Sequence, residues 1–197
     1  MTKKLVILNG PPGCGKDALA KDGFFHVKFA SELKIMTHRL YGVLNPEDIF
    51  QFESTKDIPN HQYFYGLTPR QAYIAVSEQY VKPVHGMSFF GDRLADLIEQ
   101  VSATKIIASD GGLIEELIPV AERLGGKNIL VVKIYRPGFD FEGDSRSYYP
   151  KEALDDLSVF AVDLFNKSSL QSFLARGEEL ISLWLGDYEQ NIYEEGN

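Results

Sequence analysis

A glycine-rich segment near the N-terminus carries the residue pattern with the clearest chemistry in this sequence. It reads Gly10-Pro-Pro-Gly-Cys-Gly-Lys16-Asp17 and fits the spacing G-x-x-x-x-G-K. In such a loop, glycines let backbone N–H groups surround a polyphosphate, and the lysine places a positive charge on its terminal oxygens. The segment therefore predicts a nucleoside triphosphate site built from consecutive residues: Pro12, Gly13, Cys14, Gly15, Lys16, Asp17 and Ala18.

Asp17 departs from the pattern, which has Ser or Thr at this position because a hydroxyl is a neutral ligand of magnesium. A carboxylate can hold magnesium directly or through water, and it is tolerated at a helix start. Its negative charge near the phosphates opposes nucleotide binding, and we expect the metal to offset it. The alternative is a simple Gly-Pro turn with Lys16 in solvent, which leaves the position of the lysine unexplained.

The elements that must position this loop alternate along the chain between apolar runs and helical patterns. Apolar runs predict strands at five places: 5–9, 25–29, 104–110, 129–135 and 159–165. Helical patterns cover six segments: 18–21, 31–41, a helix from 68 onward, 89–101, 113–124 and an amphipathic helix around 180–185. This alternation predicts a three-layer α/β fold with a parallel sheet. Residues 42–67 show no clear element, and we expect an excursion over a substrate site.

Ligands of parallel sheets bind at the carboxyl ends of the strands. Four residues of the chain follow predicted strand ends and should converge there: Lys16, Ala30, Asp110 and Arg136. Asp110 is placed to orient magnesium or to accept a proton from the acceptor, although an aspartate before two glycines also suits a turn.

Composition and motifs exclude several classes of nucleotide-binding protein. The chain has 197 residues, 44% of them hydrophobic, and a formal net charge of −8. One domain fits this length, and the acidic balance argues against nucleic acid as a partner. No apolar run reaches the roughly 18 residues of a membrane span, so we expect a cytoplasmic protein with no membrane partner. A GTPase switch needs Asn-Lys-x-Asp, and the nearest match, Asn166-Lys-Ser-Ser169, lacks the aspartate.

Basic residues outside the loop are candidates for phosphate binding. Arg70 stands at a helix start, where the dipole disfavours a cation, so it suits an anionic ligand, with an ion pair to a nearby carboxylate as the alternative. Lys34 suits the acceptor phosphate or a solvated helix face. Arg136 and Arg146 bracket a glycine-punctuated excursion, where we expect a lid whose arginines bridge the phosphates. The alternative for Arg146 is a local salt bridge with Asp144.

Six segments together resemble the deoxynucleoside monophosphate kinases of tailed phages, over roughly residues 4–175. They are Gly-Lys-Asp at 15–17, Phe29-Ala-Ser-Glu-Leu-Lys34, Thr68-Pro-Arg-Gln-Ala-Tyr73, Phe89-Phe90-Gly91, Arg136-Pro-Gly138 and Asp163-Leu-Phe-Asn166. That family belongs to the adenylate-kinase-like branch of P-loop kinases. The resemblance implies a parallel-sheet core, a helical monophosphate-binding region and an arginine-bearing lid. It also accounts for Asp17, because Gly-Lys-Asp is the ending that this family has.

On this resemblance the chain is one domain with a core at about 3–41, 102–136 and 157–185. The monophosphate-binding region covers about 42–101, the lid about 137–150, and an acidic tail 188–197. The implied cofactors are ATP and Mg²⁺, with Asp17 and Asp110 as metal ligands and Asn166 beside the donor adenine. Five residues are predicted to be catalytic: Lys16, Arg70, Asp110, Arg136 and Arg146. Seven are predicted to bind the acceptor: Ala30, Lys34, Arg70, Tyr73, Phe89, Phe90 and Glu115.

Several alternatives stay open at the level of sequence. Phe89 and Phe90 suit stacking on the acceptor base, but aromatic pairs also belong to cores. The acceptor is a nucleotide or another small phosphorylated molecule, such as dephospho-coenzyme A or phosphomevalonate. A nucleotide-binding regulatory module without transfer activity is the alternative of a different class. A phage-encoded protein would work in the host cytoplasm, and a homodimer stays open.

Overall fold

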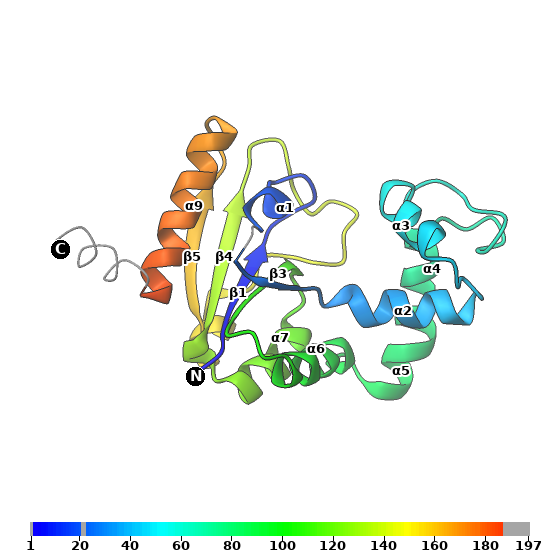
Figure 1. The fold of residues 1–197 in the computed structure, drawn as a ribbon, viewed down its shortest axis with the longest axis horizontal. Helices are drawn as coiled ribbons and strands as arrows, with labels where there is room; N and C mark the ends of the chain where they lie inside the picture. Colours follow the sequence, from blue (N-terminus) through cyan, green and yellow to red (C-terminus); the bar gives the residue numbers. More distant parts are fainter. Residues whose placement is uncertain (1, 21–22, 187–197) are drawn as a thin grey trace.

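A computed structural model describes residues 2–20 and 23–186. Its described part contains a five-stranded sheet in which all pairings are parallel, in the order β2-β3-β1-β4-β5 (Figure 1). The strands are β1 (Lys4–Asn9), β2 (Phe25–Val27), β3 (Lys105–Gly111), β4 (Ile129–Tyr135) and β5 (Phe160–Phe165). This arrangement, with helices on both faces of the sheet, confirms the predicted three-layer α/β fold. The predicted strand at 25–29 is shorter, because the next helix begins at Ala30.

Strand β1 is the centre of the sheet and is covered on both faces. Ile7 pairs with Ala108 of β3 on one side and with Val131 of β4 on the other. Alternate residues of a strand point to opposite faces. Leu5 and Ile7 belong to one apolar cluster, whereas Val6 and Leu8 belong to the other. The near-continuous apolar runs of the sequence follow from this double coverage.

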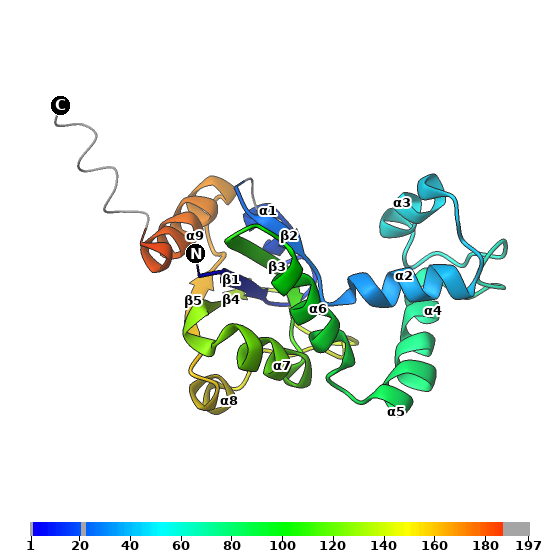
Figure 2. The same cartoon turned by 60° about the horizontal axis from the view of Figure 1, so that its bottom comes forward.

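Helices cover both faces of the sheet, as Figure 2 shows. One face carries α1 (Lys16–Leu19) and α9 (Leu170–Leu185), and the other carries α6 (Phe89–Gln100), α7 (Ile114–Leu124) and α8 (Lys151–Asp156). A short 3₁₀ turn, η2 (Gly126–Asn128), precedes β4. Helix α1 has a single turn, so the helix dipole offers less to an anion than a longer helix would. The predicted helix end at Lys21 lies outside the described residues, as does the predicted tail 188–197.

A helical region projects from the sheet core, and α2 (Ala30–Leu40) leads into it (Figure 1). The other members are α3 (Pro46–Ser54), α4 (Pro69–Ala75), the π-helical segment η1 (Val76–Val81) and α5 (Lys82–His85). The expectation of no element within 42–67 was wrong, because α3 lies there. Asn45 caps this helix by accepting from the Glu47 N–H, Pro46 occupies its first turn, and Phe52 is buried. The cap and proline were readable signals of a helix start.

The C-terminal amphipathic helix is present as α9. Phe173 and Ile181 of this helix are buried against the sheet, and Trp184 is partly buried in the same cluster. The Lys4 ammonium donates to the Trp184 carbonyl at 3.1 Å and lies 4.8 Å from the centre of its ring. Among the described helices, none combines the length and the apolar character needed to cross a membrane.

Candidate active site

A cavity of about 510 Å³ opens at the carboxyl ends of the strands and extends toward the helical region. Its walls come from the glycine loop, the end of β3, the start of α2, the segment α4–η1–α5, the start of α7 and residues 143–146. Elements far apart in sequence thus surround one space. The loop end of this cavity is called the donor end below, and the end lined by the helical region is called the acceptor end.

The curl of the glycine loop depends on two residues with positive φ. Gly13 has φ 76° and Gly15 has φ 113°, a backbone conformation that residues with a side chain rarely adopt. A Cβ atom at Gly15 would also lie 3.0 Å from the Asn166 amide nitrogen and from the Phe173 ring. The loop therefore keeps its shape through glycine at these positions.

Lys16 is buried at the donor end, with 8% of its surface exposed. Its ammonium donates to the carbonyl oxygens of Gly10 at 2.5 Å and Pro11 at 2.6 Å. Burial lowers the pKa of Lys16. A desolvated cation held by neutral carbonyls gains strongly from an approaching anion, because charge-assisted hydrogen bonds are stronger than those to neutral acceptors.

Asp110 occupies the boundary between the two ends. Its carboxylate accepts from the backbone N–H groups of Phe29 at 2.9 Å and Ala30 at 3.0 Å. Burial raises the pKa of Asp110, and these two donors oppose the rise. The side chain is therefore fixed in position by the first residues of α2.

Asp17 and Asp110 both line the cavity, so the predicted magnesium ligands share one space. The described residues contain no cluster of three or more His, Cys, Asp or Glu side chains suited to a metal. Magnesium bound with a nucleotide takes most of its ligands from phosphates and water, with one or two protein carboxylates. The two aspartates fit that form of binding.

The cations of the acceptor end are paired with carboxylates. Arg70 donates to Asp57 at 2.6 and 3.3 Å, and Lys34 pairs with Glu53. The ion-pair alternative considered for Arg70 is therefore present in the structure. A phosphate that binds here must compete with these carboxylates or be added beside them.

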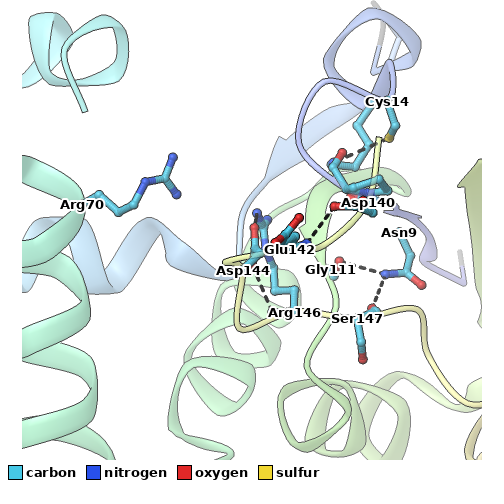
Figure 3. Close-up of polar contacts among 12 residues, drawn as sticks. Asn9, Cys14, Arg70, Gly111, Asp140, Glu142, Asp144, Arg146 and Ser147 are labelled. Atoms are coloured by element: carbon cyan, nitrogen blue, oxygen red, sulfur yellow. Dashed lines mark hydrogen bonds and ion pairs between the residues drawn. The ribbon is translucent and has the colours of Figure 1, made fainter. Parts of the chain in front are cut away.

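Arg146 forms a two-point ion pair with Asp144, at 2.9 and 2.6 Å. Figure 3 shows this pair facing Arg70, which projects from α4 toward it across the cavity. The local salt bridge proposed as the alternative is thus present, and the guanidinium still lines the cavity. Arg146 and Arg70 approach the same space from two different elements.

Asn9 fixes the C-terminal end of the predicted lid, 137–150. This fully buried amide donates to the carbonyls of Gly111 at 3.1 Å and Ser147 at 2.9 Å (Figure 3). Its oxygen accepts from the Tyr149 N–H at 3.0 Å. One side chain therefore ties the ends of β1 and β3 to residues 147–149. Sequence reasoning missed Asn9, although a polar residue at the end of an apolar strand was a signal.

The structure brings most predicted site residues to the cavity. Thirteen line it: Pro12, Gly13, Gly15, Lys16, Asp17, Ala18, Ala30, Lys34, Arg70, Tyr73, Phe90, Asp110 and Arg146. Five do not: Cys14, Phe89, Glu115, Arg136 and Asn166. The roles proposed for all of these residues stay predictions. The contacts that the five residues make outside the cavity are described next.

Three of these five lie around the loop rather than in the cavity. The Cys14 side chain is fully buried beneath the loop, and its carbonyl accepts from the Asn166 amide at 2.9 Å. Arg136 donates to the Gly13 carbonyl at 2.6 Å and lies 4.3 Å from the Phe139 ring centre. These residues brace the loop from outside, so any contact with phosphates requires movement.

The other two lie on helices that turn them away. Phe89 packs edge-on against Phe90 and 5.0 Å from the His85 ring. Glu115 is exposed, and the next residue, Glu116, is the one that faces the cavity. Glu116 was missed, although its position four residues before Val120 places it on the buried stripe of α7, where a charge is unexpected.

Comparisons with known proteins find solved structures with some similarity of overall fold. No protein-family model matches the sequence, and no curated protein matches it. Among solved structures, a sugar kinase from Janibacter sp. HTCC2649 is similar, with 13% identity, 93% of this chain and 95% of that chain covered, and a TM-score of 0.45. A gluconokinase from Sinorhizobium meliloti 1021 has 13% identity, 98% coverage of both chains and a TM-score of 0.39. Because both TM-scores are below 0.5, this likeness carries no weight for function.

Proposed function

We propose that this protein is a (deoxy)nucleoside monophosphate kinase, which transfers the γ-phosphoryl group of ATP to a nucleoside monophosphate and releases ADP and the diphosphate. One observation carries the proposal. A single cavity is lined at one end by the glycine loop with buried Lys16, and at the other by Lys34, Arg70 and Arg146, with Asp110 between them. A transfer between two phosphate groups needs this arrangement of a cradle facing separate cations.

At the donor end, the loop N–H groups and Lys16 bind the triphosphate. Magnesium, held with the phosphates by Asp17 and Asp110, supplies charge neutralisation when bound. Asp110 is kept in place by its two backbone donors.

At the acceptor end, Arg70 and Lys34 bind the monophosphate, and Arg146 bridges the two phosphate groups. Planar guanidinium groups contact phosphate oxygens at two points, which fixes their orientation as well as their charge. Alignment of donor and acceptor is the largest contribution, because positioning alone can supply roughly 7–11 kcal/mol of the barrier. Residues 137–150 act as the lid that excludes water from the reaction.

A panel of acceptors in a coupled ADP-release assay tests the proposal. It contains the four common deoxynucleoside monophosphates, dephospho-coenzyme A, phosphomevalonate and gluconate, each with ATP and magnesium. We expect ADP release that depends on at least one nucleoside monophosphate and exceeds release with the other acceptors. Release with dephospho-coenzyme A or phosphomevalonate alone would assign a different phosphorylated acceptor. ATP binding with no acceptor-dependent release would favour a regulatory module.

A further inference from the structure

Glu116 is a buried carboxylate that no predicted role uses. It lies in the first turn of α7 and lines the acceptor end of the cavity, and only 8% of the surface of the residue is exposed to solvent. Its carboxylate makes no hydrogen bond or ion pair with any residue in the described ranges 2–20 and 23–186. A buried charge without a partner costs stability, so such a group points to a ligand that supplies the missing donors.

A cation lies near Glu116 without pairing with it. Lys82, also buried, pairs with Glu78 at 2.6 Å, and the Ser77 hydroxyl donates to the same carboxylate at 3.0 Å. Ser77 and Glu78 come from the π-helical segment η1, a kind of distortion that is frequent at functional sites. This corner of the cavity therefore presents the Lys82–Glu78 ion pair beside the Glu116 carboxylate, which has no hydrogen-bond partner among the described residues.

Apolar side chains also line the acceptor end of the cavity, beside its charged groups. Leu33, Tyr73, Ile74 and Phe90 line the cavity together with the polar corner. A nucleobase has two apolar faces and a polar edge, so it matches apolar walls that end in hydrogen-bonding groups. A sugar carries hydroxyl groups on every side and matches such walls poorly.

We propose that Glu116 selects the acceptor base by accepting hydrogen bonds from adjacent N–H donors, and that the preferred acceptor is a guanine nucleotide. This inference rests on the proposed function. Guanine presents one acceptor, O6, beside two donors, N1–H and the N2 amino group. The acceptor faces Lys82, and the two donors face the Glu116 carboxylate.

The other bases satisfy this corner less well. Thymine has one N–H between two carbonyl oxygens, so an oxygen must face the carboxylate. Adenine and cytosine each offer a single amino group on this edge, next to an acceptor nitrogen. A site built to bind a pair of donors discriminates strongly against ligands that leave its buried polar groups unpaired.

The variant Glu116→Gln tests the inference, because it keeps the size of the side chain and removes its charge. Glu122→Gln, an exposed position on the same helix, is the matched control. Equilibrium binding of dGMP and dTMP is measured by calorimetry on the full chain, and kcat/KM is measured for both with ATP and magnesium. Circular dichroism and thermal melting check the fold of each variant.

We expect Glu116→Gln to weaken dGMP binding by about 10- to 100-fold, and kcat/KM for dGMP by a similar factor. Affinity for dTMP should stay the same or increase, since an amide offers both a donor and an acceptor to its edge. Glu122→Gln should behave as the unmodified protein does with both nucleotides.

Two results would overturn the inference: unchanged dGMP binding in Glu116→Gln, or an equal loss for dGMP and dTMP in a folded variant. Failure of the proposed function has a different signature. In that case no nucleotide accepts phosphate, whereas the calorimetric comparison still decides whether Glu116 distinguishes guanine from thymine.

Discussion

The donor and acceptor ends of the cavity are built in different ways. The donor end consists mainly of residues from one short segment, 12–18, of which all but Cys14 line the cavity. The acceptor end is assembled from side chains of α2, α4, α5 and α7. These helices are distributed over the chain between residues 30 and 124. The residues of the donor end can therefore be recognised as a short sequence motif. The residues of the acceptor end come together only when the chain folds.

The two ends also differ in how they hold their charges. Lys16 is bonded to neutral carbonyl oxygens, whereas Arg70 and Arg146 are bonded to carboxylates. When the triphosphate binds, Lys16 therefore exchanges neutral carbonyl partners for a charged phosphate. Acceptor binding must compete with ion pairs that already exist, so we expect the acceptor to be held more weakly.

The largest expected effect comes from the donor end. Replacing Lys16 with Ala should lower kcat by about 1,000-fold, because the cation stabilises charge that develops during transfer. The loss should be the same for every acceptor, since Lys16 belongs to the donor end. Steady-state kinetics with two acceptors measures it, and Lys127→Ala, at an exposed position, is the control. Near-native activity of the Lys16 variant would show that the loop is not the donor site.

Arg70 should produce the next largest effect, and of a different kind. Replacing it with Gln should raise KM for the acceptor by about 50-fold, through the loss of charge-assisted hydrogen bonds to phosphate. Affinity for ATP should be unchanged, as measured by calorimetry without acceptor. A change in ATP affinity with an unaltered acceptor KM would place Arg70 at the wrong end.

Glu116 predicts an effect on stability that depends on pH. Burial and the Asp110 and Glu115 charges raise its pKa to about 7, against the opposing charges of Lys82 and Arg146. Because the folded pKa exceeds the ordinary value of 4.5, the ionised form destabilises the fold. The penalty is absent below about pH 4.5, grows toward pH 7 and is constant above it.

Replacing Glu116 with Gln should therefore raise the free energy of unfolding by about 2 kcal/mol at about pH 8, since an uncharged amide costs less to bury. Near pH 4 the variant and the unmodified protein should be equally stable. Urea unfolding at both pH values measures this difference. A variant that is less stable at high pH would mean that the carboxylate has structural partners.

Replacing Asp57 should have the smallest effect on kinetics. It tests whether the acceptor end, unlike the donor end, holds its cation in a competing ion pair. Replacing Asp57 with Asn removes the competitor for Arg70 and should lower acceptor KM by about threefold, because exposed ion pairs contribute little. The KM for ATP serves as the internal control and should not change. A higher acceptor KM would mean that Asp57 positions Arg70 for the phosphate.

The sequence alone predicted the parallel sheet and the residues of the glycine loop, because these depend on local patterns. Apolar runs mark strands that are buried on both faces, and the loop spacing marks the phosphate cradle. The short helix α3 was missed although Asn45-Pro46 signalled its start, because its apolar residues pack within the helical region rather than on the sheet.

Much of the acceptor end could not be read in the same way. Lys82 and Glu116 are far apart in sequence and line one cavity only because α5 and α7 fold beside it. The sequence analysis named Glu115 and not Glu116, and one residue turns a side chain about 100° around a helix, so the neighbour lines the cavity instead. Asn9 acts through three tertiary hydrogen bonds to residues more than 100 positions away.

The most direct test of the account follows the transferred group itself. The protein is incubated with ATP labelled at its γ-phosphate, magnesium and a mixture of deoxynucleoside monophosphates, and the labelled products are separated. We predict that the label appears as the β-phosphate of a deoxynucleoside diphosphate, and that Lys16→Ala abolishes this product. Label found only in inorganic phosphate, or only in ATP, would contradict the assignment of the cavity as a site of transfer between nucleotides.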